Sequence, residues 1–201
     1  MKGDLNRDST SRSSKESISA KAVRVLLIAP SLGILGGQAV QAQRLLNNLR
    51  REPGIDVDFL PINPRFPGTI GRLQERVKYL RTILTSILYV TELLRRIPHY
   101  DIVHIFSASY FSFVLAPTPA ILIARLYCKK IVLNYRSGQA KDHLRRWRWT
   151  AIPTIKLVDE IVVPSSYLVD VFSEFGLKAR AIYNTVETER FIFRERSPLR
   201  P

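Results

Sequence analysis

Two glycines follow the first apolar run of the chain, in a position where they could bind an anion. Gly36 and Gly37 come after the run V-R-V-L-L-I-A at Val23–Ala29 and begin a segment with helical spacing. A double glycine at the start of a helix exposes backbone N–H groups and lets a phosphate approach closely. A plain tight turn is the alternative, and the residue types leave both readings open.

Two further apolar runs carry residues of similar chemical interest. Arg136 follows the run K-I-V-L-N-Y and shares its loop with Gly138. Its guanidinium could hold a phosphate or a carboxylate, or it could lie on the surface. His104 lies in the run D-I-V-H-I, where it could take part in catalysis or be a hydrogen-bonded core histidine.

The standard fingerprints are missing around these residues. The glycine loop G-I-L-G-G at residues 33–37 is neither G-x-G-x-x-G nor a Walker loop, since no Walker lysine follows it. No zinc-ligand spacing and no Ser-His-Asp set can be identified, so we expect no metal and no cofactor. His143 beside Asp142 could be an oriented imidazole, but we expect an exposed pair at the start of a helix.

A short run alternates basic and aromatic side chains. It comprises Arg145, Arg146, Trp147, Arg148 and Trp149. This interleaving suits a membrane interface, stacking on nucleic acid, or tryptophans that dock on their own domain.

Composition limits the partners of the chain without selecting one. The 201 residues carry a formal net charge of +14, from 31 Lys and Arg against 17 Asp and Glu. Such a charge favours nucleic acid, acidic lipid surfaces or phosphorylated ligands. Because Cys128 is the only cysteine, an internal disulfide is excluded, and a reducing compartment is indicated.

Neither the first residues nor the middle of the chain predicts membrane insertion. Residues 1–21 are rich in serine and charged residues, have no apolar signal-peptide core, and are expected to be a disordered tail. Residues 97–124 lack Lys and Arg, but they contain Asp101, histidines and prolines. We therefore expect no transmembrane helix there.

Strand-like and helical patterns alternate along the chain. Strands are expected at 23–29, 56–61, 101–105, 130–135, 159–163 and 179–183. Helices are expected at 38–51, at 72–97, within 111–127 on either side of Pro117 and Pro119, at 141–157 with a break or a kink at Pro153, and at 166–174. This alternation predicts an α/β fold with a Rossmann-like, mostly parallel sheet and helices on both faces. Ligands of such sheets bind at the carboxyl ends of the strands, near the switch in strand order.

Five stretches, in this order, resemble the family-4 retaining glycosyltransferases. They are V-R-V-L-L-I-A-P-S-L-G-I-L-G-G with the helix after it, Y-D-I-V-H-I-F-S-A, K-I-V-L-N-Y-R-S-G, D-E-I-V-V-P-S-S-Y-L and I-Y-N-T-V-E-T-E-R-F. They cover about residues 22–193, which we expect to form one domain, followed by a linker or tail at 194–201.

The resemblance implies one half of a GT-B architecture, in which two Rossmann-like domains face a cleft. The first domain mainly binds the acceptor. The second binds most of the nucleotide-sugar through a glutamate pair, a motif that this sequence lacks. We therefore expect the N-terminal half of an enzyme that transfers a sugar to a hydroxyl acceptor on a glycan or lipid. It would be inactive without a donor-binding domain, which could lie on another chain.

The resemblance also implies roles for single residues. Gly36 and Gly37 match the loop that meets the donor phosphates. Arg136 stands where many members have a histidine that helps to place the donor sugar, and it could stabilise the diphosphate charge. His104 is the second candidate catalytic residue and would line the cleft.

The closing motif departs from the family pattern at two positions. Asn184-Thr185 replaces the usual Asn-Gly, and Glu187 stands for the common aspartate. Asn184 and Gly138 are expected to line the cleft.

Many members of the family work at the cytoplasmic membrane on lipid-linked or polysaccharide acceptors. The resemblance therefore implies a cytoplasmic protein, peripheral at the inner face of the membrane, in cell-envelope or polysaccharide biosynthesis. The alternative function is a non-enzymatic basic module that binds an anionic membrane or a partner protein. Nucleic acid is the least favoured partner, because only the net charge of the chain supports that hypothesis.

Overall fold

The computed structural model describes residues 21–33, 36–64, 78–107 and 109–184. The strands are β1 (Val23–Ala29), β2 (Ile55–Pro61), β3 (Ile102–Ser107), β4 (Lys130–Tyr135), β5 (Glu160–Val163) and β6 (Arg180–Ala181). The helices are α1 (Gly37–Leu49), α3 (Lys78–Arg96), α4 (Phe111–Leu115), α5 (Pro117–Leu126), α6 (Ala140–Arg146), α7 (Arg148–Ile155) and α8 (Ser166–Glu174), with a 3₁₀ turn at Ile97–His99.

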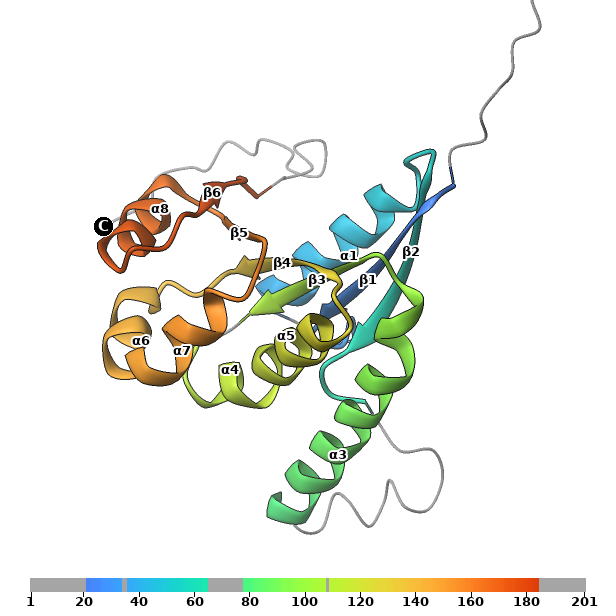
Figure 1. The fold of residues 1–201 in the computed structure, drawn as a ribbon, viewed down its shortest axis with the longest axis horizontal. Coiled ribbons are helices and arrows are strands. Elements are labelled where there is room, and N and C mark those ends of the chain that lie inside the picture. Colours follow the sequence, from blue (N-terminus) through green and yellow to red (C-terminus); the bar gives the residue numbers. More distant parts are fainter. Residues whose placement is uncertain (1–20, 34–35, 65–77, 108, 185–201) are drawn as a thin grey trace, which may run out of the picture.

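The strands form one parallel sheet in the order β2-β1-β3-β4-β5-β6 (Figure 1). The chain moves from β1 to β2 in one direction and then adds β3 on the other side of β1. The switch in strand order therefore lies between β1 and β3, where open parallel sheets bind their ligands. The expected α/β fold is confirmed.

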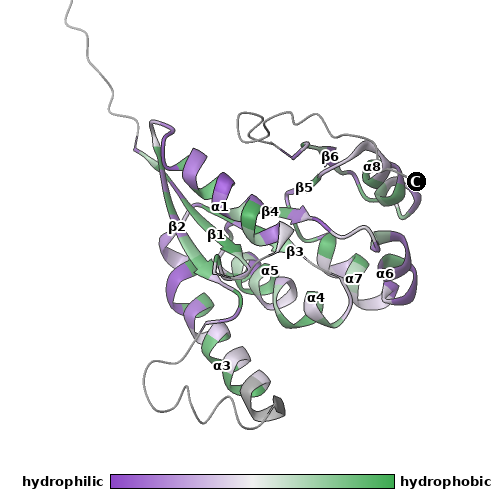
Figure 2. Ribbon diagram, turned by 180° about the vertical axis from the view of Figure 1, so that it is seen from behind, coloured by the Kyte–Doolittle hydropathy of each residue, from purple (hydrophilic) through white to green (hydrophobic). Residues whose placement is uncertain are grey.

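Two apolar clusters lie on opposite faces of the sheet. The smaller cluster packs α1 on β1, β2 and the start of β3, through residues such as Leu27, Leu46 and Phe106. The larger one joins the other face to the remaining helices, and it includes Leu133 and Phe172. Most of strand β1, which lies between the two clusters, is accordingly hydrophobic (Figure 2).

Helix α8 begins and ends as its sequence predicts. Ser165 caps it, because its Oγ accepts a hydrogen bond from the N–H of Leu168 at 3.4 Å. Gly176 closes it with φ of +69°, a conformation that glycine adopts without the strain of a side chain.

Of the expected break or kink at Pro153, the break is wrong. The long segment instead divides at Trp147, which separates α6 from α7, and Pro153 lies inside α7. Pro153 is exposed, so its ring and the carbonyl that it leaves without a helical partner face solvent rather than the core.

Several expectations fall outside the described residues. They include the tail at 1–20, the helix start at 72–77 and the segment from 185 onward. Within the described part of the chain, none of the helices is both long and apolar enough to cross a membrane.

Candidate functional site

The side chain of Arg136 lies at the carboxyl end of β4, on the face of the sheet that carries α1. Its Nε donates to Asn134 Oδ1 at 2.9 Å, and an Nη donates to the side-chain oxygen of Asn184. The guanidinium lies over the Phe106 ring, 5.1 Å from its centroid. Half-burial lowers the pKa of Arg136, yet guanidinium groups stay charged in proteins.

Arg136 lacks an anionic partner among the described residues. Its contacts are two neutral amides and an aromatic ring, and no described carboxylate lies within ion-pair distance of it. A cation removed from water is normally paired with an anion. The site is therefore suited to an anionic ligand.

His104 supports Arg136 through Asn134. The Nδ2 of Asn134 lies 3.1 Å from His104 Nε2, and its Oδ1 receives the bond from Arg136. Burial, together with the charge of Arg136, lowers the pKa of His104 to about 4. The imidazole is therefore neutral near pH 7, and its Nε2 accepts the hydrogen bond from the amide.

The start of α1 meets Arg136 at the carbonyl of Ser107. Gln38 Nε2 donates to this oxygen at 3.3 Å, and the backbone N–H of Arg136 donates to it at 3.3 Å. Gly36 occupies the cap position, with no side-chain capping bond and no acidic residue in the first turn. The positive end of the helix dipole is therefore free of any described acidic side chain at this point.

The two glycines of this loop are not required by local sterics. A Cβ built on Gly36 or Gly37 would meet no atom within 4 Å, and Gly36 has an extended backbone with φ of −168°. Both are exposed. Because they have no side chains, the N-terminus of α1 stays accessible to a ligand.

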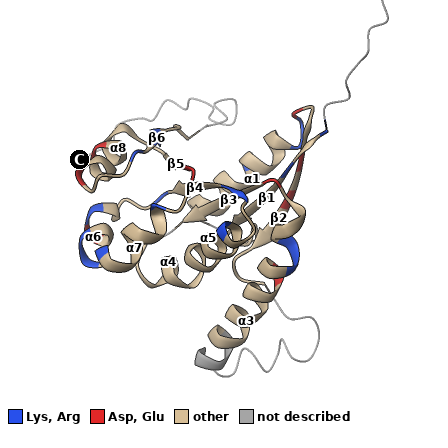
Figure 3. Ribbon diagram, viewed as in Figure 1, with Lys and Arg blue, Asp and Glu red and all other residues tan. Residues whose placement is uncertain are grey.

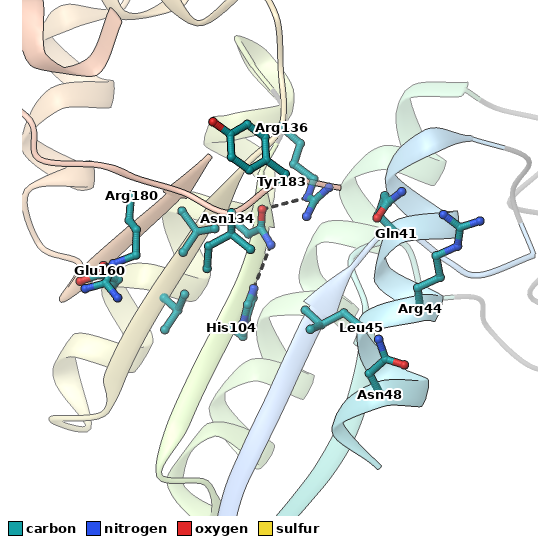
Figure 4. Close-up of a pocket in the computed structure, with 13 residues that line it drawn as sticks. Gln41, Arg44, Leu45, Asn48, His104, Asn134, Arg136, Glu160, Arg180 and Tyr183 are labelled. Atoms are coloured by element: carbon teal, nitrogen blue, oxygen red, sulfur yellow. Dashed lines mark hydrogen bonds and ion pairs between the residues drawn. The ribbon is translucent and has the colours of Figure 1, made fainter. Parts of the chain in front are cut away.

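A groove of about 370 Å³ extends from Arg136 along the sheet (Figure 4). Its floor includes His104, Asn134 and Val162, and one of its walls is a side of α1. Gly138 is exposed and does not line it. No three His, Cys, Asp or Glu side chains that could share a metal ion gather within the described ranges.

A second pocket of about 240 Å³ lies near the carboxyl end of β2. It is bounded by the loop after β2, the start of α3, and α4. Asn63 in this loop accepts a hydrogen bond from the N–H of Ser31 at 3.0 Å, which links the pocket to the segment that directly follows β1. The described lining carries no charge, and its members are Ile62, Asn63, Thr82, Thr85, Ser86, Tyr89, Ser112, Leu115 and Ala116.

The expectation that His143 is exposed is wrong. His143 is completely buried, with Nδ1 2.8 Å from the hydroxyl of Tyr135, which in turn lies 2.9 Å from Ser109 Oγ. Its Nε2 has no described hydrogen-bond partner, and burial lowers its pKa to about 4. Only Asp142 of the pair is exposed, where it accepts a hydrogen bond from Tyr110.

The basic and aromatic run divides between core and surface. Trp147 is half-buried and packs against the larger apolar cluster, whereas Trp149 is 82% exposed with the guanidinium of Arg148 stacked on it at 5.0 Å. Arg145 and Arg146 are exposed, and basic side chains mark α6 in Figure 3. None of the five lines the groove, and the four exposed ones, all except Trp147, form a separate surface.

The structure brings together Gly36, Gly37, His104, Arg136 and Asn184 at one edge of the sheet. Two residues that complete the site were missed from the sequence. Asn134 was read only as part of a strand, although it is a polar residue inside an apolar run. Gln38 was read only as part of a helix, and its glycine neighbours were the sole available signal.

Comparison with known proteins agrees with the fold. A search of curated proteins finds no match. The model of one protein family, described as Glycosyltransferase Family 4, matches residues 35–190, which include Gly36, Arg136 and Asn184. The match covers most of the chain, which therefore belongs to Glycosyltransferase Family 4.

Proposed function

We propose that this domain is the acceptor-side half of an enzyme that transfers a sugar from a nucleotide-sugar to a hydroxyl group. The diphosphate of the donor sits between the start of α1 and Arg136. One observation carries the proposal: Arg136 is a half-buried cation whose described partners are all neutral. A diphosphate supplies the missing negative charge.

The chemistry of transfer explains why a cation is needed at this point. The bond between the anomeric carbon and the diphosphate oxygen breaks while the acceptor oxygen bonds to that carbon, and the hydroxyl proton leaves with the nucleoside diphosphate. Negative charge develops on the leaving diphosphate. Arg136 and the first N–H groups of α1 stabilise that charge. No cofactor is required, because the leaving group is part of the donor.

His104 is assigned a positioning role rather than a catalytic one. It is neutral, and it accepts a hydrogen bond from Asn134. This bond turns the carbonyl oxygen of Asn134 toward Arg136 Nε. The guanidinium is thereby held at the edge of the sheet, facing Asn184.

The acceptor occupies the uncharged pocket between α3 and α4. Hydroxyl and amide side chains such as Asn63, Ser86 and Ser112 line it. Such groups suit the hydroxyl pattern of a carbohydrate. The hydrogen bond between Ser31 and Asn63 ties this pocket to the segment after β1, which leads toward the glycine loop.

A second, donor-binding domain completes the enzyme in this proposal. The described residues supply contacts to the phosphates, but we assign none of the described pockets to the nucleoside. We therefore expect the described domain to bind a nucleoside diphosphate weakly by itself and to transfer no sugar alone.

Binding of nucleotide-sugars tests the phosphate site. Uridine, guanosine and adenosine diphosphate sugars are titrated into the wild-type chain and into Arg136→Ala, with Arg145→Ala as the matched surface control. We expect Arg136→Ala to weaken the best ligand about tenfold, a loss of about 1.4 kcal/mol. Equal affinity of wild type and Arg136→Ala would reject the site.

A membrane-binding role is the second candidate, whether or not the domain acts in transfer. The observation that favours it is Trp149, 82% exposed beside Arg148 and close in sequence to Arg145 and Arg146. Exposed tryptophan with basic neighbours is typical of a surface that contacts anionic lipid. We place the protein in the cytoplasm, peripheral at the inner face of the membrane.

Vesicle sedimentation tests this candidate. Vesicles with and without 30% anionic lipid, a composition of about one lipid in three, are compared at low and high salt. Binding that needs anionic lipid and weakens with salt is expected. Binding that ignores lipid charge would remove the candidate.

A further inference from the structure

One side of helix α3 presents aliphatic side chains to solvent. Ile83 and Ile87 are 57% and 58% exposed, Leu94 is also exposed, and Val90 beside them is half-buried. A helix normally buries such a stripe against another element. We call these four residues the α3 stripe.

The spacing of the α3 stripe is that of a coiled-coil seam. The four residues follow one another at intervals of four, three and four. Ile87 and Leu94 thus take heptad position a, and the other two take position d. A strict a and d stripe is the narrow surface by which two helices meet. The spacing therefore favours a second helix as the occupant.

The described core holds α3 by a different side of the helix. Tyr89 and Leu93 are buried in the larger apolar cluster, and the hydroxyl of Tyr89 donates to the carbonyl of Ala116 at 3.1 Å. These two residues take heptad positions c and g rather than a and d. The stripe is therefore distinct from the surface by which α3 packs on its own domain.

The charged side chains of α3 lie away from the stripe. Within residues 82–96 they are Glu92, Arg95 and Arg96, at positions f, b and c of the heptad. Arg95 pairs with Glu92 at 3.8 Å, and Arg96 pairs with Asp58 at 3.8 Å. Positions e and g, which border the seam, carry no charge over this range.

The uncharged border of the stripe favours a second copy of the chain over a lipid surface. The sequence carries a net charge of +14, so two copies repel each other wherever their basic surfaces meet. This repulsion is weakest at an uncharged seam. Lipid is less suited, because long basic side chains are favoured beside the apolar face of a helix at a membrane interface.

The stripe is complementary to itself in the antiparallel direction. A two-fold axis that passes between residues 88 and 89 places Ile83 opposite Leu94 of the second copy. The same axis places Ile87 opposite Val90 of the second copy. Each a residue therefore meets a d residue, and the two helix dipoles oppose each other.

The position of α3 in the fold also favours antiparallel pairing. Leu93 anchors its C-terminal end in the core, while its N-terminal half extends beyond the other labelled helices (Figure 1). A helix of 19 residues is roughly 28 Å long. Antiparallel pairing therefore holds the two basic domains at opposite ends of the helix pair, whereas parallel pairing would place them side by side.

We propose that the α3 stripe is the contact surface of a homodimer, in which α3 pairs in antiparallel fashion with α3 of a second copy. Each copy contributes the four side chains of the stripe, whereas a standard protein interface uses about 20–30 residues a side. The dimer is therefore weak and forms only at higher protein concentration. This inference does not depend on the proposed function.

Sedimentation velocity over a concentration series tests the dimer. The wild-type full chain is expected to shift from monomer to dimer between about 1 and 100 µM, a range centred on a Kd of about 10 µM. Ile87→Glu puts a carboxylate into the seam, so this variant should stay monomeric over the whole series. Leu126→Glu on α5 is the matched control, because Leu126 is also an exposed aliphatic residue, and it should keep the wild-type shift. Circular dichroism checks that both variants fold.

Crosslinking establishes the direction of pairing. In a Cys128→Ser background, a chain with Ile83→Cys is mixed with a chain with Leu94→Cys, and a short bismaleimide is added. Antiparallel pairing should crosslink the mixed pair and neither variant alone. Parallel pairing would instead crosslink each variant to itself.

Four results would overturn the proposal. They are a wild-type chain that stays monomeric over the whole series, a dimer that persists in Ile87→Glu, crosslinking in the parallel pattern, and a monomeric wild type whose binding to anionic vesicles is lost on Ile87→Glu. The last result would indicate that lipid covers the stripe.

Discussion

At the scale of single residues, Asn134 decides how Arg136 can act. Both polar atoms of its side-chain amide form hydrogen bonds: Nδ2 donates to His104, and Oδ1 accepts from Arg136. A neutral amide orients the guanidinium without cancelling its charge. The site thus keeps a directed positive charge for a ligand.

Substitutions of Asn134 separate orientation from charge. Asn134→Asp would give Arg136 a carboxylate partner, so we expect nucleoside diphosphate affinity to fall at least tenfold. The variant also replaces the N–H donor to His104 Nε2 by an oxygen, so we expect some loss of stability as well. Asn134→Leu leaves Arg136 Nε without its acceptor and should cost about 1–3 kcal/mol of stability. Urea unfolding and ligand titration measure the two effects. Unchanged affinity in Asn134→Asp would contradict the anion site.

Two histidines, the buried His143 and the partly buried His104, predict a loss of stability in mild acid. The pKa values of His104 and His143 fall from 6.5 to about 4 in the folded state, in both cases chiefly because of burial. As the pH drops below 6.5, the unfolded chain binds protons that the folded chain does not. The free energy of unfolding should therefore fall between pH 6.5 and 4, by up to about 3 kcal/mol for each histidine.

Chemical unfolding at a series of pH values measures this loss. His143→Phe keeps the aromatic packing, and Tyr135 retains its contact with Ser109. Because the variant removes one of the two histidines with a lowered pKa, it should remove about half of the pH dependence. The exposed His99→Gln is the control with the wild-type profile. A flat profile between pH 7 and 4.5 would show that neither histidine stays neutral in the fold.

The sequence predicted part of this residue-scale picture. Gly36 and Arg136 were found because each follows an apolar run, which marks the end of a strand. His143 was misplaced, because only the fold reveals that Tyr135 and Phe113 enclose it. Polar residues buried by distant segments leave no local signal.

At the scale of elements, the start of α1 acts through its open backbone. Since no atom lies within 4 Å of a Cβ on Gly37, a side chain there costs the fold nothing. Gly37→Ala should raise the free energy of unfolding by about 0.4–1 kcal/mol. Gly37→Asp should also be tolerated, because a carboxylate suits a helix N-terminus.

The same two variants should weaken nucleoside diphosphate binding in a defined order. The methyl group of Gly37→Ala obstructs the approach of the phosphates, and the carboxylate of Gly37→Asp also repels them. We expect a larger loss of affinity for Asp than for Ala, measured by titration calorimetry. Wild-type affinity in Gly37→Asp would exclude the helix start from the site.

The two tryptophans at the α6–α7 corner should respond differently to removal. Trp147 packs on the core, so Trp147→Ala is expected to cost about 2–4 kcal/mol. Trp149 is exposed, so Trp149→Ala should change stability by less than about 0.5 kcal/mol while weakening binding to anionic vesicles. Thermal unfolding and vesicle sedimentation measure these effects. Unaltered vesicle binding would remove Trp149 from the lipid contact.

The order of the elements was predictable, and some of their ends were not. The apolar runs located the strands correctly because buried parallel strands are apolar at nearly every position. The break at Trp147 was missed because Pro153 is the stronger local signal for the end of a helix. The proline is nevertheless tolerated inside α7, since it lies on the exposed side of that helix.

At the scale of the whole molecule, the sheet separates two kinds of surface. The arginines of the groove lie on the α1 side, and the uncharged pocket lies between α3 and α4. Alternation along the chain predicted the sheet. It could not show that His104, Asn134, Glu160 and Arg180 share one open face, because that depends on the register between strands.

This separation predicts that the acceptor pocket can be blocked without disturbing the phosphate site. Ser112 is exposed at the wall of the pocket, so Ser112→Trp should fill much of its 240 Å³ with little effect on the core. We expect nucleoside diphosphate affinity and the free energy of unfolding to stay at wild-type values, while binding of a panel of oligosaccharides is lost. Titration calorimetry and saturation-transfer NMR measure the two ligands. The exposed Ser166→Trp on α8 is the matched control, and equal oligosaccharide binding by both variants would place the acceptor elsewhere, since only one of them fills the pocket.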